Sequence, residues 1–258
     1  MKDIAVSADG NPVHFDIEGD GAPALVFVHG WSCDRTYWSR QMSHFAGRFQ
    51  VVAIDLAGHG DSGINRNAWT MQAFGEDVVA VVEMLELRDL VLIGHSMGGD
   101  VIVEAALSLR DRVAGLVWVD TYTTLGQPRT REKLEEFLDP FRRDFVTAAQ
   151  DMIRDMFTAG SDAELVEWVT ADMAAAPPHI AIDALEHCLS NDRAIASRLN
   201  ELEPPIVAIN SENAPTDIAS LRRHGVRALL LPGVGHFLMM EDPDTFNHLL
   251  DETIRSFR

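Results

Sequence analysis

One serine in this sequence of 258 residues lies in a setting that favours covalent chemistry. Ser96 belongs to the segment G-H-S-M-G at 94–98, which follows an apolar run at 90–93 and precedes a helical pattern at 100–109. The glycines leave room for a strained strand-to-helix turn that would expose the serine hydroxyl. The helix that begins there would direct N–H groups toward the place where an oxyanion forms. These features predict that Ser96 is a catalytic nucleophile.

A nucleophilic serine needs a base within hydrogen-bond reach, and His236 is the histidine in the most suitable context. It lies in the segment P-G-V-G-H-F at 232–237, directly after the apolar run 226–231. Because parallel strands end at the same edge of a sheet, we expect His236 beside Ser96. It would take the serine proton and later return it to the leaving group. No role is expected for His14, His44, His95, His179, His187, His224 and His248.

Short apolar runs alternate with longer amphipathic segments over most of the chain, which predicts an α/β fold. The runs are nearly continuous in Val, Leu and Ile, as expected for strands buried on both faces of a parallel sheet. We therefore expect a mostly parallel central sheet with helices on both faces. The strands are expected at 24–28, 49–54, 90–93, 113–119, 206–209 and 226–231. The clearest helices are expected at 71–85, 100–109 and 244–257.

The strand pattern disappears between residues 121 and 203, where apolar residues recur at helical spacing. One crossover between strands rarely needs more than a single helix, whereas this stretch is long enough for several. We interpret 121–203 as an inserted helical cap over the sheet edge, with 1–120 and 204–258 forming the core domain. Breaks between the cap helices are expected at Pro128, Pro140, Gly160 and Pro177-Pro178.

Together with the serine and histidine segments, two further motifs make the chain resemble the α/β-hydrolase family over nearly its whole length. H-G-W at 29–31 resembles the oxyanion-loop motif, and D-L-A-G-H-G-D-S at 55–62 resembles the D-x-x-G-x-G-x-S turn. The resemblance implies the α/β-hydrolase fold and a Ser-His-acid triad. It also implies an oxyanion hole formed by the backbone N–H groups of Trp31 and Met97. The histidines of the two motifs, His29 and His59, are expected to stabilise loops, and Arg35 is expected to be a surface or loop-stabilising residue.

The acid of the implied triad is where the sequence departs from the commoner family pattern. Relatives usually carry it in a stretch like G-x-x-D-P, and here Ala214 occupies the position of that aspartate. We favour Asp120, because it ends a strand expected to neighbour the serine-bearing strand and because some family members place the acid there. Glu212 and then Asp217 are the alternatives.

A serine at the elbow, in place of the aspartate of the family's dehalogenases and epoxide hydrolases, implies cofactor-free acyl transfer to water through an acyl-enzyme. The expected substrate is a small to medium, largely apolar carboxylic ester, lactone or thioester. Alternatives on the same fold are a cofactor-independent ring-opening dioxygenase, a hydrolase of carbon–carbon bonds, and a non-catalytic ligand receptor. The residues expected to line the substrate pocket are Trp31, Trp38, Tyr122 and Phe237. Some of the cap's own side chains must also face it, from among Phe137, Phe141, Phe145, Met152, Met156, Phe157, Trp168 and Met173.

The composition excludes several partner classes. Lys and Arg total 21 against 40 for Asp and Glu, which gives a formal net charge of −19. Such a surface repels phosphate backbones and anionic lipid, so a small-molecule substrate is expected and no nucleic acid or membrane. The sequence contains no H-E-x-x-H or EF-hand motif, and its glycines do not form a G-x-G-x-x-G after the first strand, so no metal or cofactor is expected. Two distant cysteines and the lack of a signal-like or membrane-spanning run predict a cytoplasmic protein, while the oligomeric state stays open.

Overall fold

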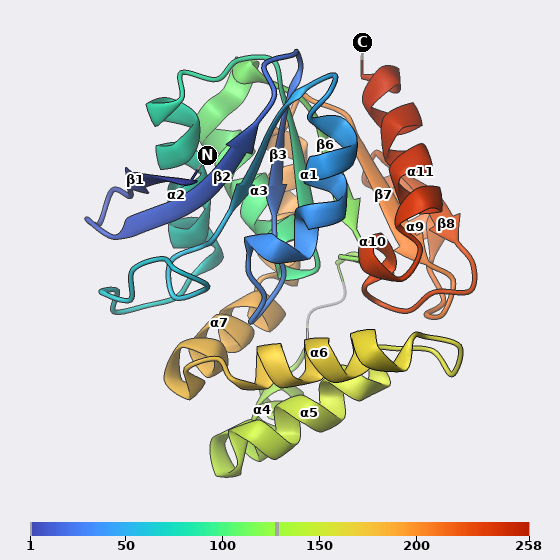
Figure 1. Cartoon of the computed structure of the whole chain (residues 1–258). Helices are drawn as coiled ribbons and strands as arrows, with labels where there is room; N and C mark the ends of the chain where they lie inside the picture. Colours follow the sequence, from blue (N-terminus) through green and yellow to red (C-terminus); the bar gives the residue numbers. More distant parts are fainter. Residues whose placement is uncertain (1, 127–128, 258) are drawn as a thin grey trace.

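The computed structural model describes residues 2–126 and 129–257, and an eight-stranded sheet forms the centre of these ranges (Figure 1). Its strand order is β1-β2-β4-β3-β5-β6-β7-β8. The six strands from β3 to β8 run parallel, whereas β1 pairs antiparallel with β2 and β2 antiparallel with β4. The strands are β1 (Lys2–Val6), β2 (Pro12–Glu18), β3 (Ala24–Val28), β4 (Gln50–Ile54), β5 (Leu90–His95), β6 (Val113–Val119), β7 (Ile206–Ser211) and β8 (Val226–Leu231).

The six strands expected from the sequence are thus confirmed as β3 to β8. Strands β3 and β5 are buried along their whole length, which explains their continuous apolar runs. Strands β1 and β2 were not expected. Strand β2 is buried only at alternate positions over its first half, so it lacks the continuous apolar run that identified the others.

Helices lie on both faces of the sheet because the order of the strands reverses. The chain crosses from β3 to β4 in one direction along the sheet and from β4 to β5 and β6 in the other. Right-handed crossovers in opposite directions place their helices on opposite faces. Helix α11 packs against α1, and α2 packs against α3. These helices are α1 (Ser39–Phe45), α2 (Met71–Met84), α3 (Met97–Leu109) and α11 (Pro243–Ser256).

Among the described residues, five α-helices lie between β6 and β7, and we call them the helical insertion. Figure 1 shows α4, α5 and α6 as a layer beyond one end of the sheet. Pro178 occupies the first turn of α7, and Asp144 and Asp162 cap α5 and α6 through their side chains. The helices are α4 (Arg131–Arg143), α5 (Phe145–Asp155), α6 (Ala163–Ala174), α7 (Pro178–Ser190) and α8 (Asp192–Arg198).

The break expected at Pro140 is wrong, because Pro140 lies inside α4 and the helix continues to Arg143. The break expected at Pro128 lies outside the described residues. Buried apolar side chains of the sheet and of the helical insertion form one continuous cluster. The division of the chain at residues 120 and 204 into core and cap stays a prediction. Within the described ranges, every helix is too short or too polar to cross a membrane.

Candidate active site

The turn between β5 and α3 holds Ser96 in a strained backbone conformation, with φ 51° and ψ −120°. Its N–H donates to Val119 O at 2.9 Å, which ties the turn to the neighbouring strand β6. A Cβ added to Gly94 would lie 2.2 Å from Gly98 O, and one added to Gly98 would lie 2.6 Å from His29 O. Both positions therefore exclude any side chain, which is the physical reason for the spacing of the two glycines.

The structure brings His236 together with Asp120 at the carboxyl ends of the strands. The Nδ1 atom of His236 lies 2.7 Å from Asp120 Oδ2. The other carboxylate oxygen of Asp120 accepts a hydrogen bond of 2.8 Å from Ser211 N–H in β7, and Asp120 N–H donates to Ile209 O at 3.0 Å. Both oxygens of the carboxylate are thus engaged, so its orientation toward the imidazole is fixed by two strands. The two side chains are mostly buried, with exposed fractions of 19% for His236 and 11% for Asp120.

The alternative acids lie elsewhere. Glu212 and Ala214 are exposed. Asp217 caps the short helix α9 (Ile218–Arg223) by accepting a hydrogen bond of 2.8 Å from Ser220 N–H. Among the described residues, Asp120 is the one carboxylate that contacts the His236 ring.

Two hydrogen bonds fix the backbone of His236, one at its N–H group and one at its carbonyl oxygen. Its N–H donates to Met156 O, after the end of α5, at 2.8 Å. Its carbonyl oxygen lies 3.0 Å from His95 Nε2. Burial lowers the pKa of His95 well below its usual value, so the ring is neutral, and its Nε2–H donates because a carbonyl oxygen only accepts. Sequence reasoning missed this contact, since a bond to a backbone carbonyl leaves no signature in residue types.

Met97 directly follows Ser96, and Trp31 follows Gly30, whose backbone approaches the serine. Met97 is the first residue of α3, so its N–H has no acceptor within the helix. In the described part of the chain, neither N–H has an acceptor. A Cβ on Gly30 would lie 2.9 Å from His95 Nδ1 and 3.3 Å from Ser96 Cβ, so the loop before Trp31 approaches the serine closely.

His29 orients this loop. Burial lowers the pKa of His29, which keeps its ring neutral. Its Nε2 accepts a hydrogen bond of 3.0 Å from Leu56 N–H, so the proton is on Nδ1 and is donated to Gly30 O at 2.8 Å. Because the carbonyl of Gly30 points to His29, the N–H of the same peptide unit, which belongs to Trp31, points the opposite way.

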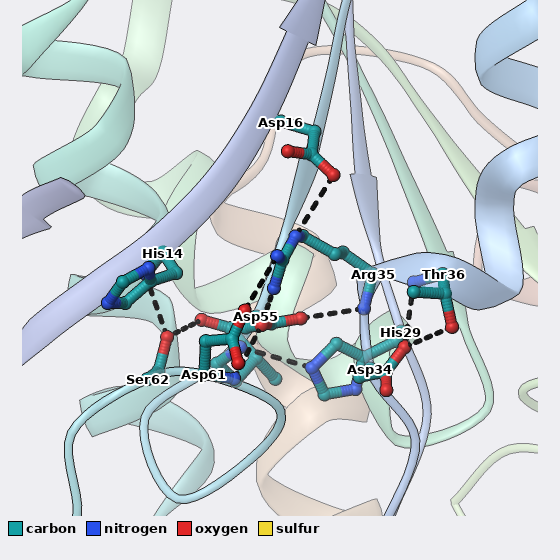
Figure 2. A network of polar contacts seen from close by, with 10 residues as sticks. His14, Asp16, His29, Asp34, Arg35, Thr36, Asp55, Asp61 and Ser62 are labelled. Carbon is teal, nitrogen blue, oxygen red and sulfur yellow. Dashed lines mark hydrogen bonds and ion pairs between the residues drawn. The ribbon is translucent and has the colours of Figure 1, made fainter. Parts of the chain in front are cut away.

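An ion cluster around the buried Arg35 and Asp55 holds the same loop against the turn 55–62 (Figure 2). Arg35 is 5% exposed and binds Asp16 at 3.0 Å and Asp61 at 2.8 Å, and it also contacts Asp55. Its backbone N–H donates to Asp55 Oδ1 at 2.7 Å. Ser62 completes the turn by donating to Asp55 O at 2.7 Å. Arg35 is therefore a loop-stabilising residue, and the first residue of the D-x-x-G-x-G-x-S motif acts as its partner.

Ser96 and His236 line one cavity of about 310 Å³ beneath the helical insertion. Ser96 also lines an adjoining cavity of about 300 Å³, which includes Asp100 and Tyr122. We call these the apolar arm and the polar arm. The apolar arm adds Trp31, Cys33, Phe137, Met152, Met156, Met173, Leu185 and Phe237. The polar arm adds Thr121, Thr123 and Thr124. The wall common to both comprises Ser96, Met97, Arg129, Cys188 and Leu189.

Three of the four residues expected in the substrate pocket line one of the two arms. Trp31 and Phe237 line the apolar arm, and Tyr122 lines the polar arm. The placement of Trp38 in the pocket is wrong. It ends the short turn Arg35–Trp38 and is fully buried in the core, 5.1 Å from Phe27 between ring centroids. The expected cap residues that do face the site are Phe137, Met152, Met156 and Met173.

No hydrogen bond joins Ser96 Oγ to His236 among the described residues, although both side chains line the apolar arm. Catalytic hydrogen bonds are often long in ligand-free sites and tighten when substrate binds. The arrangement at this sheet edge can therefore combine a strained serine, an oriented imidazole and two unpaired N–H groups around one reacting atom.

Residues 25–249 match the sequence profile of the Alpha/beta hydrolase family. The chain belongs to this family. The match covers the H-G-W motif, the serine turn, the helical insertion and the histidine loop, so one family accounts for all of the motifs that the sequence analysis singled out.

Two relatives of the hydrolase are distant but match most of its length. It is 25% identical over 248 residues to 3-oxoadipate enol-lactonase 2 of Acinetobacter baylyi, covering 91% of this chain and 90% of the relative. It is 27% identical over 247 residues to a pimeloyl-[acyl-carrier protein] methyl ester esterase of Nitrosospira multiformis, covering 88% and 92%. An esterase from Exiguobacterium antarcticum superposes with a TM-score of 0.87 at 16% identity, covering 99% of this chain and 100% of that one, and shows the same fold.

Proposed function

We propose that this α/β hydrolase is a serine hydrolase. Its substrates would be small to medium, largely apolar carboxylic esters, lactones or thioesters, cleaved through an acyl-enzyme. The observation that carries the proposal is the 2.7 Å contact between Asp120 and His236, because His236 lines the same cavity as Ser96. The names of the relatives support it, since one is an enol-lactonase and another a methyl ester esterase.

In the proposed reaction, Ser96 Oγ attacks the substrate carbonyl carbon while its proton passes to His236 Nε2. Asp120 accepts the hydrogen bond from His236 Nδ1–H, which fixes the tautomer and stabilises the imidazolium. The carbonyl oxygen becomes an oxyanion that receives the N–H groups of Trp31 and Met97. The tetrahedral intermediate collapses, and the alcohol leaves with the proton from His236.

Deacylation repeats these steps with water. His236 takes a proton from the water molecule as its oxygen attacks the acyl carbon, and it returns that proton to Ser96 Oγ as the acid departs. Both steps use the same oxyanion site, so one set of contacts serves the whole cycle. The cavity volumes lie at the lower end of the range typical of small-molecule sites, which supports a small-molecule substrate. Two free thiols, Cys33 and Cys188, agree with the proposed cytoplasmic location.

Steady-state hydrolysis of p-nitrophenyl esters of graded acyl length tests the proposal. We expect hydrolysis that falls at least ~10⁴-fold in Ser96→Ala. The matched control is Ser43→Ala, because Ser43 is exposed and its hydroxyl donates to Ser39 O within α1. Rates should be equal under air and argon. Hydrolysis that survives in Ser96→Ala contradicts the proposal, and turnover that requires oxygen favours the dioxygenase alternative.

A folded protein inactive on every ester would also contradict the proposal. The hydrolase of carbon–carbon bonds would then be tested with a diketone, because it would use the same residues on a different substrate. Ligand binding without turnover of any of these compounds would favour the receptor.

A further inference from the structure

The common wall of the two arms carries a cation. Arg129 lines both cavities, and it is the one Lys or Arg among their described lining residues. Its side chain is exposed, so a ligand in the cavity can reach it. The polar arm also contains Asp100, whose carboxylate accepts hydrogen bonds from Tyr122 Oη and, at 3.2 Å, from Asn191 Nδ2. Asp100 in α3 is therefore hydrogen-bonded to Tyr122, which follows β6, and to Asn191 of the insertion.

Arg129 differs from the buried arginines of this protein in its partners. Arg35 binds three carboxylates, and Arg66 binds Asp9 at 2.7 Å and Asp77 at 2.6 Å. Arg129 forms no ion pair with any described residue, in a chain whose formal net charge is −19. A positive group that has no ion-pair partner among the described residues, and that lines the same cavities as Ser96, suits an anionic part of the substrate.

The side chains around Arg129 indicate which kind of substrate would carry the anionic group. Its guanidinium lies over the ring of Phe137, 5.3 Å from the centroid. Such stacking orients the guanidinium while its five N–H groups remain available to an acceptor. Phe137 belongs to the apolar arm, whose other side chains include Met152 and Leu185. A ligand that fits this space would have an apolar chain. It would end in a group whose two oxygen atoms accept hydrogen bonds from the Arg129 guanidinium.

We propose that Arg129 is a specificity-determining residue that binds a carboxylate on the substrate, separated by an apolar chain from the bond that is cleaved. The inference rests on the proposed function and narrows its substrate class. That class becomes monoesters of aliphatic dicarboxylic acids, or esters and lactones that carry a carboxylate on the alcohol side. Arginine and carboxylate form two parallel charge-assisted hydrogen bonds, which select the group by geometry as well as charge.

Pairs of substrates that differ only in one charge test the inference. On the acyl side, p-nitrophenyl hydrogen adipate, pimelate and suberate are compared with neutral p-nitrophenyl esters of equal chain length. On the alcohol side, 4-acyloxybenzoates are compared with their methyl esters. The measured quantity is the ratio of kcat/KM for the charged and neutral member of each pair. We expect the wild type to favour the charged member in one series by roughly 10- to 100-fold.

Three variants test whether Arg129 causes the preference for the charged substrate. Arg129→Gln should lower the ratio by roughly 10-fold or more, chiefly through KM, and Arg129→Lys should retain part of it because it keeps the charge without the planar fork. The control is Arg131→Gln, which removes the same charge two residues away at a side chain that is 85% exposed and outside both arms. Its ratio should equal that of the wild type.

Two results would overturn the inference. One is a wild-type ratio near one in both series, and the other is an equal loss in Arg129→Gln and Arg131→Gln. Hydrolysis of the neutral esters that depends on Ser96 separates this failure from failure of the proposed function. Calorimetric binding of adipate to Ser96→Ala, with and without Arg129→Gln, gives a second readout that needs no turnover. Adipate affinity that is equal in the two proteins would also contradict the role of Arg129.

Discussion

The two sides of the cavity are built in different ways. On the sheet side, hydrogen bonds orient the proposed acid and base. The Asp120 carboxylate is engaged by Ser211 N–H and the His236 ring, and the backbone of His236 is held by Met156 O and His95 Nε2. On the insertion side, the lining is mainly apolar and is positioned by packing, for example by Met173 and Leu185. The sheet edge thus carries the proposed chemistry, and the insertion shapes the space for the substrate.

This difference predicts that a change at the sheet edge damages the rate far more than a change in the insertion. Asp120→Ala removes the group that orients His236 and should lower kcat by roughly 10³- to 10⁴-fold in a folded protein. Steady-state kinetics on a p-nitrophenyl ester measure the effect. Glu212→Ala is the matched control, because Glu212 is an exposed carboxylate on a nearby loop. If Asp120→Ala keeps the wild-type kcat while Glu212→Ala loses it, the acid is misassigned.

His95 extends the comparison to a residue that would not touch the substrate. His95→Leu deletes the donor to His236 O and should lower kcat by roughly 10- to 100-fold, with a smaller change in KM, because small displacements of a catalytic base are costly. His95→Gln retains an N–H donor and should recover part of kcat. Unfolding midpoints of both variants control for a loss of folded protein. Equal losses of kcat in the two variants would show that the hydrogen bond does not position His236.

A histidine buried in the turn 55–62 should make folding sensitive to acid. Burial lowers the pKa of His59 to about 3, whereas an unfolded histidine titrates near 6.5. Below pH 6.5 the unfolded chain binds a proton at His59 that the folded chain does not bind. The contribution of His59 to the free energy of unfolding is therefore fully present above that pH and decreases as the pH falls. His59 should remove about 1 kcal/mol between pH 7.5 and 5.5.

Urea unfolding of the wild type and of His59→Gln at pH 7.5 and 5.5 measures this contribution. The free energy of unfolding should fall less in His59→Gln than in the wild type, because glutamine does not titrate. Equal decreases in the two proteins would mean that His59 is not kept neutral by folding.

The smallest effects are expected in the insertion. Met173→Ala enlarges the apolar arm and should raise the rate for longer relative to shorter acyl chains by roughly 3- to 10-fold. Met84→Ala is the control, since Met84 is 53% exposed at the end of α2. The ratio of kcat/KM across the acyl series is the measurement. An unchanged ratio would place the acyl chain outside the apolar arm.

The same difference explains what could be predicted from the sequence. The elbow is visible because close backbone approach demands glycine at 94 and 98, and a steric demand leaves a residue pattern. Asp120 could be favoured because neighbouring parallel strands end at one edge. The long apolar runs located β3 to β8 because burial on both faces favours apolar side chains, most clearly in β3 and β5, which are buried along their whole length.

The features that were missed have no comparable pattern. Trp38 was expected in the pocket because it flanks the presumed catalytic residues, but a short helical turn directs it into the core. His95 contacts a backbone carbonyl 141 residues away, which any residue type could supply. Arg129 precedes α4 as an ordinary exposed arginine, and its place at the junction of the two arms depends on the packing of the insertion.

The most direct test of the proposed nucleophile is covalent labelling with an alkyl fluorophosphonate, followed by peptide mass spectrometry. This reagent transfers its phosphonyl group to an activated serine and releases fluoride. We predict one phosphonyl group per chain, located on Ser96, and much slower labelling in Asp120→Ala because His236 is then misoriented. Labelling at another residue, or a folded hydrolytic enzyme that does not react, would contradict the assignment of Ser96.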